Sequence, residues 1–251
     1  MKLNELEKQL SNIYQFEKFD DYCHNGIQVE GKEDVEKILL SVNISNQVID
    51  YAIKEKADAI IVHHGFFGKS FLNIKGNLKL RIKKLLVNDI SLIGIHLPMD
   101  ANAEIGHNKV ISNIIGLNFL ETFNYGFIGK NTGNLDIFEI KSRIEKKLSD
   151  YGIVKKDNIR IYDYLNKKPE KIAVISGEAY KYFEEAISYG VDLFITGSIA
   201  QHIPEIAIEN RKAIITIGHY NSEIFGIVTL SNLLKESFNL KTSTIFLPND
   251  L

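Results

Sequence analysis

Cysteine, tryptophan and proline are scarce in this 251-residue sequence, which contains one, none and four of them, respectively. The single cysteine, Cys23, excludes an intrachain disulfide and any metal site assembled from several thiolates of one chain. Apolar runs such as 59–62 and 193–195 are strand-sized and fall far short of the roughly 20 residues that span a bilayer. We therefore expect a cytoplasmic protein that has no membrane partner.

An excess of either charge is also missing, since 30 Lys and Arg residues against 32 Asp and Glu residues give a formal net charge of −2. Tracking of nucleic-acid phosphates needs clustered basic residues, so this balance argues against a nucleic-acid partner. The segment 1–14 intersperses Glu and Lys with apolar residues and predicts an amphipathic helix, not a signal peptide. The length and the 45% hydrophobic content favour a globular protein of two domains.

The sequence contains an approximate copy of itself. The Glu-Lys-Ile triplet at 36–38 recurs at 170–172, an offset of 134, and the same offset relates Asp58 to Asp192. Each copy reads as a strand, an amphipathic helix and a second apolar strand, which is the pattern of a parallel βαβ unit. A second correspondence relates the segment 90–96 to 213–219, and each segment ends in a histidine.

This pattern predicts an α/β fold with two similar domains produced by internal duplication, whose largely parallel sheets are flanked by helices. We place the domains at 1–125 and 126–251, because glycines weaken regular structure between 123 and 130. The segment 244–247 reads as one more strand, and it could return to the first domain.

Chemically active side chains gather where the predicted strands end. His63 and His64 follow the apolar strand 59–62, and Asp100 follows the strand that ends near His96. Open α/β sheets place their ligand sites at the carboxyl ends of such strands. In the second copy, a histidine and a glutamate four residues apart lie on one face if the segment is helical. These two residues are His219 and Glu223.

Five nitrogen and oxygen ligands are too many for one catalytic zinc ion, and they suit two divalent ions about 3.5–4 Å apart. The sequence therefore predicts two ions per subunit, of Zn, Fe, Mn, Co or Ni. The five ligands are His63, His64, Asp100, His219 and Glu223.

Two further residues are candidates for proton transfer beside the ions, namely His96 and the ligand Glu223. A lone strand-end histidine is more often a satisfied polar residue, and a lone His and Glu pair is more often a solvated helix face. Only their joint placement at equivalent strand ends favours the metal site. We interpret Asp58 and Asp192 as structural turn residues, and His107 as a residue that shapes the next helix.

The motifs at 25–31 (NGIQVEG), 63–65 (HHG), 96–101 (HLPMDA) and 218–223 (GHYNSE) together resemble the GTP cyclohydrolase I type 2 homologue family, also called NGG1-interacting-factor-like. The resemblance covers almost the whole chain. It implies a dinuclear metal centre in the cleft between two α/β domains, held by the five ligands named above, and a toroidal homohexamer. The segments 176–178 and 196–198 depart from the family pattern.

The ligand set favours a metal-dependent hydrolase that acts on a nucleotide or another small metabolite. The alternative is a non-enzymatic metal-binding hexamer that serves as a scaffold or regulator for protein partners. A P-loop and a glycine-rich phosphate cradle of the usual pattern are absent from the sequence, so GTP itself is suggested by the family resemblance alone.

Overall fold

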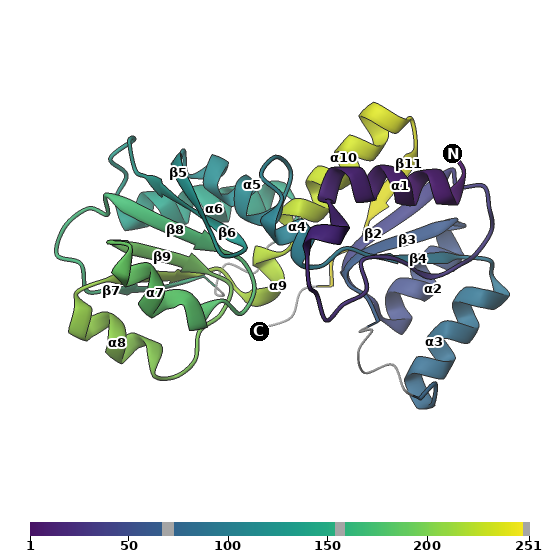
Figure 1. The fold of residues 1–251 in the computed structure, drawn as a ribbon, viewed down its shortest axis with the longest axis horizontal. Helices are drawn as coiled ribbons and strands as arrows, with labels where there is room; N and C mark the ends of the chain where they lie inside the picture. Colours follow the sequence, from purple (N-terminus) through teal and green to yellow (C-terminus); the bar gives the residue numbers. More distant parts are fainter. Residues whose placement is uncertain (67–72, 154–158, 248–251) are drawn as a thin grey trace. The chain divides into compact units, whose positions relative to one another are not determined.

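The computed structural model describes residues 1–66, 73–153 and 159–247, which form two compact units (Figure 1). The first unit comprises Met1–Met99 and Ile227–Phe246, and the second comprises Asp100–Gly226 and Leu247–Leu251. No helix in the described part of the chain combines the length and the apolar character that a bilayer crossing requires.

The first unit contains a five-stranded sheet in the order β1-β4-β3-β2-β11. The strands β2, β3, β4 and β11 run parallel, and only the edge strand β1 is antiparallel to its neighbour. Figure 1 shows α1 and α10 on one side of this sheet and α2 and α3 on the other. The strands are β1 (Gly26–Val29), β2 (Lys37–Asn43), β3 (Ala59–His64), β4 (Ser91–Gly94) and β11 (Lys241–Thr244), and the helices are α1 (Leu3–Tyr14), η1 (Phe16–Lys18), α2 (Asn46–Glu55), α3 (Gly76–Val87) and α10 (Phe225–Phe238).

The second unit contains a six-stranded sheet in the order β5-β6-β8-β9-β10-β7. Its three central strands, β8, β9 and β10, are parallel, whereas the strands on both sides of them pair antiparallel. The strands are β5 (Asn118–Phe123), β6 (Gly126–Lys130), β7 (Arg160–Asp163), β8 (Lys171–Ile175), β9 (Leu193–Thr196) and β10 (Ala213–Thr216). The helices are α4 (Leu97–Ala101), which begins in the first unit, α5 (His107–Ile114), α6 (Ile137–Asp150), η3 (Tyr180–Tyr182), α7 (Phe183–Ser188), α8 (Ile203–Asn210) and α9 (His219–Ser222).

The α/β fold and its βαβ elements agree with the sequence-based prediction, and the largely parallel character holds for the first sheet. In the second sheet it holds only for the three central strands. The continuous apolar runs of β3 and β9 are fully buried, as expected of strands covered on both faces. The amphipathic helix predicted at the start of the chain is α1, which buries Leu3, Leu6, Leu10 and Tyr14.

The predicted domain boundary between 125 and 126 differs from the division into units, which falls at 99/100 and again at 226/227. The glycines of the segment 123–130 belong to the β5–β6 hairpin, not to a linker. A Cβ atom on Gly126 would collide with the carbonyl oxygen of Val174, and one on Gly129 would lie 2.6 Å from that of Asn118. The strand predicted at 244–247 is wrong in its bounds, since the strand is β11, at Lys241–Thr244, and it pairs with β2 of the first unit.

The two copies share their strand register. Ile38 pairs with Ala59, and Ile172 pairs with Leu193, so both members of the pair are shifted by 134 residues. The second correspondence is shifted by one residue from our alignment. Ser91 pairs with Ala59 and Ala213 pairs with Leu193, so Ser91 and Ala213 are equivalent and the structural offset is 122 residues. The alignment of 90–96 with 213–219 has an offset of 123. Gly218, with φ at 93°, is the additional residue that separates β10 from His219.

The repeated aspartates join the strands within each copy. Asp58 Oδ2 accepts hydrogen bonds from the backbone N–H groups of Glu36 and Lys37, at 2.8 and 2.9 Å. Asp192 Oδ2 accepts equivalent bonds from Glu170 and Lys171, at 3.0 and 3.3 Å. These carboxylates therefore accept the N–H groups at the start of a neighbouring strand. Their structural role is to join two strands, and not only to shape the turn in which they lie.

We predict that Asp58→Ala lowers the free energy of unfolding by about 1–3 kcal/mol, because two partly buried N–H groups lose their acceptor. Burial alone raises the pKa of Asp58, but bonds from Lys32 and the two N–H groups outweigh burial and lower it. The effect should therefore be complete at pH 7 and should shrink below the ordinary carboxyl pKa of about 3.9. Urea unfolding at pH 7 measures the destabilisation, and urea unfolding at pH 3 measures how far it decreases.

Asp50→Ala is the matched control, since Asp50 forms an exposed ion pair with Lys84. Such pairs contribute about 0–1 kcal/mol. Equal destabilisation by the two substitutions would contradict the structural role assigned to Asp58.

Candidate metal centre

Three histidines of the first unit come together where two parallel strands end. His63 and His64 are the last residues of β3, and His96 lies two residues beyond β4, the strand beside it. The ring centroids are 4.4 Å apart for His63 and His64, 5.0 Å for His63 and His96, and 5.5 Å for His64 and His96. Each ring offers a nitrogen that lies within 4.8 Å of the other two, so this group has the spacing to hold a metal ion.

The tautomers of the two strand histidines follow from their hydrogen bonds. Nδ1 of His63 lies 3.0 Å from the carbonyl oxygen of Ile95, and Nδ1 of His64 lies 2.7 Å from Oδ1 of Asn43. Both partners are acceptors, so each Nδ1 carries the proton and each Nε2 carries the lone pair. Histidine ligands of metal ions are commonly oriented by a bond of this kind. The donor set and its orientation therefore fit a divalent metal.

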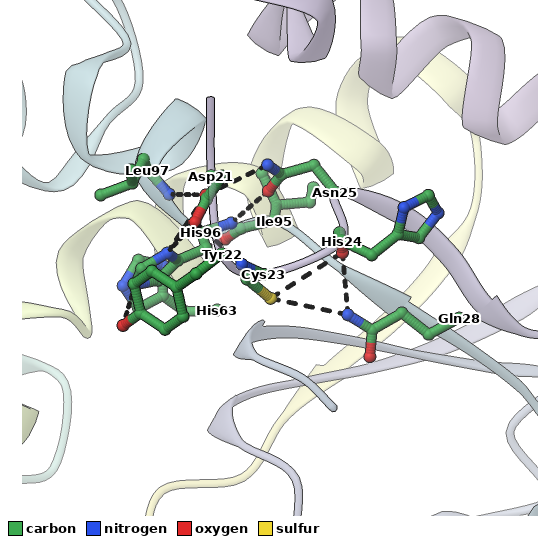
Figure 2. Close-up of polar contacts among 10 residues, drawn as sticks. All are labelled: Asp21, Tyr22, Cys23, His24, Asn25, Gln28, His63, Ile95, His96 and Leu97. Carbon is green, nitrogen blue, oxygen red and sulfur yellow. Dashed lines mark hydrogen bonds and ion pairs between the residues drawn. The ribbon is translucent and has the colours of Figure 1, made fainter. Parts of the chain in front are cut away.

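The third histidine is oriented by a carboxylate. Nδ1 of His96 lies 2.9 and 3.1 Å from the two carboxylate oxygens of Asp21 (Figure 2). Asp21 also accepts hydrogen bonds from the backbone N–H groups of Cys23 and Leu97, at 3.0 Å each, and from Nδ2 of Asn25 at 3.1 Å. The Asp21 side chain is only 2% exposed, so these donors replace water around its charge.

The Asp21 pKa reflects this balance. Burial alone would raise it, but the hydrogen bonds from His96, Cys23 and Asn25 outweigh burial and lower the pKa of Asp21 to about 2. Asp21 is therefore a carboxylate at neutral pH, and it fixes the proton of His96 on Nδ1. Asn25 completes this arrangement, because its Oδ1 accepts a 2.7 Å bond from the backbone N–H of His96.

A glutamine connects the loop 21–25 to the ends of both strands. Oε1 of Gln28 accepts the Phe66 N–H at 2.6 Å, and Nε2 donates to the carbonyl oxygen of His24 at 2.8 Å. A Cβ atom on Gly94 would lie 2.5 Å from Nε2 of Gln28, and one on Gly65 would collide with the same side chain. Both glycines are therefore needed to seat Gln28 beside the histidine group.

In the second unit, a serine and an asparagine position the predicted ligand Asp100. Oγ of Ser176 donates a 2.6 Å hydrogen bond to Oδ1 of Asp100. The buried Asn108 donates to the carbonyl oxygens of Asp100 and Tyr125, and its Oδ1 accepts the Ser176 N–H at 2.6 Å. Ser176 and Asn108 thus determine where this carboxylate lies.

His219 and Glu223 form a close pair, as their helical spacing predicted. His219 begins α9 and Glu223 follows its last residue, with Nε2 of His219 3.0 Å from Oε1 of Glu223. Gly177, with φ at 67°, lies next to this pair, and a Cβ atom on it would lie 2.7 Å from Oε1 of Glu223. A side chain at 177 would therefore displace the Glu223 carboxylate from this position.

His107 differs from His63, His64 and His96 in its tautomer. Its Nδ1 accepts a 2.9 Å hydrogen bond from the Gly226 N–H, so the neutral ring carries its proton on Nε2. In this neutral tautomer the ring is a donor at Nε2. The first residue of α5 is His107, while the N-cap is Gly106, which makes no side-chain cap bond.

Each predicted ligand is thus placed within its own unit: His63 and His64 in the first, and Asp100, His219 and Glu223 in the second. The assignment of all five to one dinuclear centre stays a prediction. Asn43 therefore orients a predicted ligand, whereas Thr196, at the end of β9, donates to the carbonyl oxygen of Gly177. Sequence reasoning gave no role in the site to Asp21, Asn25, Gln28, Asn108 and Ser176, although Asn25 and Gln28 lie in the motif 25–31.

The fold and the site together define a two-sheet α/β protein with a histidine group suited to metal at the strand ends. The family model of Duf34/NIF3 (NGG1p interacting factor 3) matches residues 1–250. The chain belongs to this family.

Relatives of the same length support this membership. The GTP cyclohydrolase 1 type 2 homologs of Yersinia pestis and Escherichia coli K12 are each 34% identical over 251 residues, and the Yersinia alignment covers 99% of both chains. A solved structure described as "protein ybgI, unknown function" is 34% identical with a TM-score of 0.91 over 100% of both chains. TTHA1606 from Thermus thermophilus is 25% identical, with a TM-score of 0.83 over 100% of both chains.

We predict that Asn43→Ala lowers the affinity for a divalent metal roughly 10- to 100-fold, because His64 loses the acceptor that orients its ring. Competition with a chromophoric chelator measures the dissociation constant. The control is Asn88→Ala, which removes an exposed amide that donates to the carbonyl oxygen of Lys84 and orients no histidine of the group. Unchanged affinity in Asn43→Ala would show that the ring orientation does not matter for binding.

Proposed function

We propose that this protein is a divalent-metal-dependent hydrolase that acts on a nucleotide or another small metabolite. One observation carries the proposal: His63 and His64 each bind an acceptor through Nδ1, which presents Nε2 for coordination. A solvated strand-end histidine needs no such orientation. The expectation from sequence adds Asp100, His219 and Glu223 as ligands, for two ions per subunit.

The chemistry that bound divalent ions supply is Lewis acidity toward a water molecule and an electrophilic centre. The chain itself supplies the proton transfer. When His63 and His64 are the ligands from this group, Nε2 of His96 keeps its lone pair, because Asp21 holds the proton on Nδ1. It can then accept a proton, and the carboxylate stabilises the imidazolium. Glu223 is the second candidate for this role, although a ligating carboxylate is a weaker base.

The printed names of the relatives motivate the substrate class, since they are called GTP cyclohydrolase 1 type 2 homologs. We extend to this chain only hydrolysis of a nucleotide or a comparable metabolite. The family description, an NGG1p interacting factor, favours a second candidate function: a metal-binding scaffold or regulator for protein partners. In that case the ions stabilise the fold and no substrate is turned over.

We predict about two divalent ions per subunit in protein purified without chelator or affinity tag, measured by inductively coupled plasma mass spectrometry. His64→Ala and Glu223→Ala should each lower this number, because each removes one ligand. His202→Ala is the control, as its ring packs on Tyr180 in the second unit and belongs to no predicted ligand set. Metal content that is zero in the native protein after reconstitution would contradict the proposal.

We further predict that the double substitution His64→Ala and Asp100→Ala abolishes hydrolysis of nucleotides and cyclic amides by the metal-loaded protein. Thermal unfolding of the same variant separates the two candidate functions. Lost turnover with an unchanged melting temperature supports the hydrolase, whereas a lowered melting temperature without turnover in any variant supports the scaffold. Light scattering of the native protein tests the homohexamer that the family resemblance implies.

A further inference from the structure

A pocket of about 720 Å³ lies within the first unit, on the segment 16–28 and beside Phe66. Its volume is in the range of about 300–1,000 Å³ that is typical of small-molecule sites. The described residues that line it include Asp21 and Tyr22, which also contact His96. The pocket therefore adjoins the histidine group.

The wall of the pocket is aromatic. Phe16, Phe19, Tyr22 and Phe66 line it, and Tyr22 is 52% exposed in spite of its size. Aromatic side chains that stay accessible around a concave site present ring faces and edges for stacking. Tyr22 also reaches the histidine group, since its ring meets that of His96 edge-on at 4.9 Å and its hydroxyl lies 3.4 Å from Nε2 of His96 (Figure 2).

The charge of the wall restricts the ligand further. Glu17 and Asp21 are acidic, and no Lys or Arg occurs among the described residues that line the pocket. Among these described residues a phosphate group would find no cation, and the carboxylates of Glu17 and Asp21 would repel it. The described part of the wall thus suits a neutral planar ring and disfavours an anion.

The pocket is also preformed. Gln28 links the Phe66 N–H to the His24 carbonyl oxygen, and Asp21 links the loop to the segment after β4. These bonds fix the lining side chains of Asp21 and Gln28 before any ligand arrives. A ring that enters would be recognised by stacking and by the exposed His24 and Glu17 at the wall.

We propose that this pocket binds the neutral planar aromatic ring of the small molecule on which the histidine group acts, with any anionic part of that molecule outside it. That the histidines act on this molecule rests on the proposed function, whereas binding of the ring does not depend on bound metal. Tyr22 would lie between the ring and His96, so the ring places the rest of the molecule beside the histidines.

Saturation-transfer NMR on the full-length protein tests this with adenosine as the neutral ring probe and ribose 5-phosphate as the non-aromatic anionic control. We expect saturation of the purine protons above that of the ribose protons, and none for ribose 5-phosphate. Phe19→Leu keeps an apolar side chain but removes the ring, and it should weaken adenosine binding roughly fivefold. Phe138→Leu, at an exposed position on α6, should leave binding unchanged.

Equal binding of adenosine by the Phe19 and Phe138 variants, or binding of ribose 5-phosphate as strong as that of adenosine, would overturn the proposal. Phe16→Leu serves as a second variant in case Phe19→Leu does not fold, and thermal unfolding checks both. Metal content is measured on the same samples. Ring binding by a protein that holds no metal supports the pocket and contradicts only the proposed function, whereas metal without ring binding contradicts only the pocket.

Discussion

The burial of one carboxylate, that of Asp21, constrains most of what surrounds the histidine group. A buried charge is tolerated only if hydrogen bonds replace the lost water, and Asp21 has donors from four residues. Meeting that requirement brings the loop 21–25 against the segment after β4 and fixes the proton of His96. The same loop forms much of the wall of the aromatic pocket. Orientation of a candidate base and shaping of a candidate binding site therefore share one electrostatic cause.

Much of the fold was predictable because parallel strands leave a strong signal. An apolar run that is buried on both faces, such as that of β3, can be recognised from composition alone. A histidine directly after such a run must lie at the carboxyl end of the strand. The repeated aspartates could be recognised as structural for a similar reason, since they recur in register with the strands that they join.

Other features were not predictable because the same residue type has two physical uses. Glycine interrupts regular structure, but it also allows close contact between strands, and Gly126 and Gly129 serve the second purpose inside a hairpin. The partners of the ligands were hidden by distance along the chain: Asp21 and His96 are 75 residues apart, and Ser176 and Asp100 are 76 apart. No local periodicity reports such a pair. The one-residue shift around Gly218 was equally invisible, since both alignments keep apolar residues in the strand.

The return of the chain's end to the first sheet has a consequence for biosynthesis. Lys241 of β11 pairs with Lys37 of β2, a separation of 204 residues, and all of the second unit except its last residues is synthesised between them. On the ribosome, the second unit emerges while the first sheet still lacks its edge strand, which leaves the outer side of β2 without a backbone partner. Completion of the first unit therefore waits for β11 to leave the exit tunnel, and a product truncated before Lys241 would display an open, apolar strand edge.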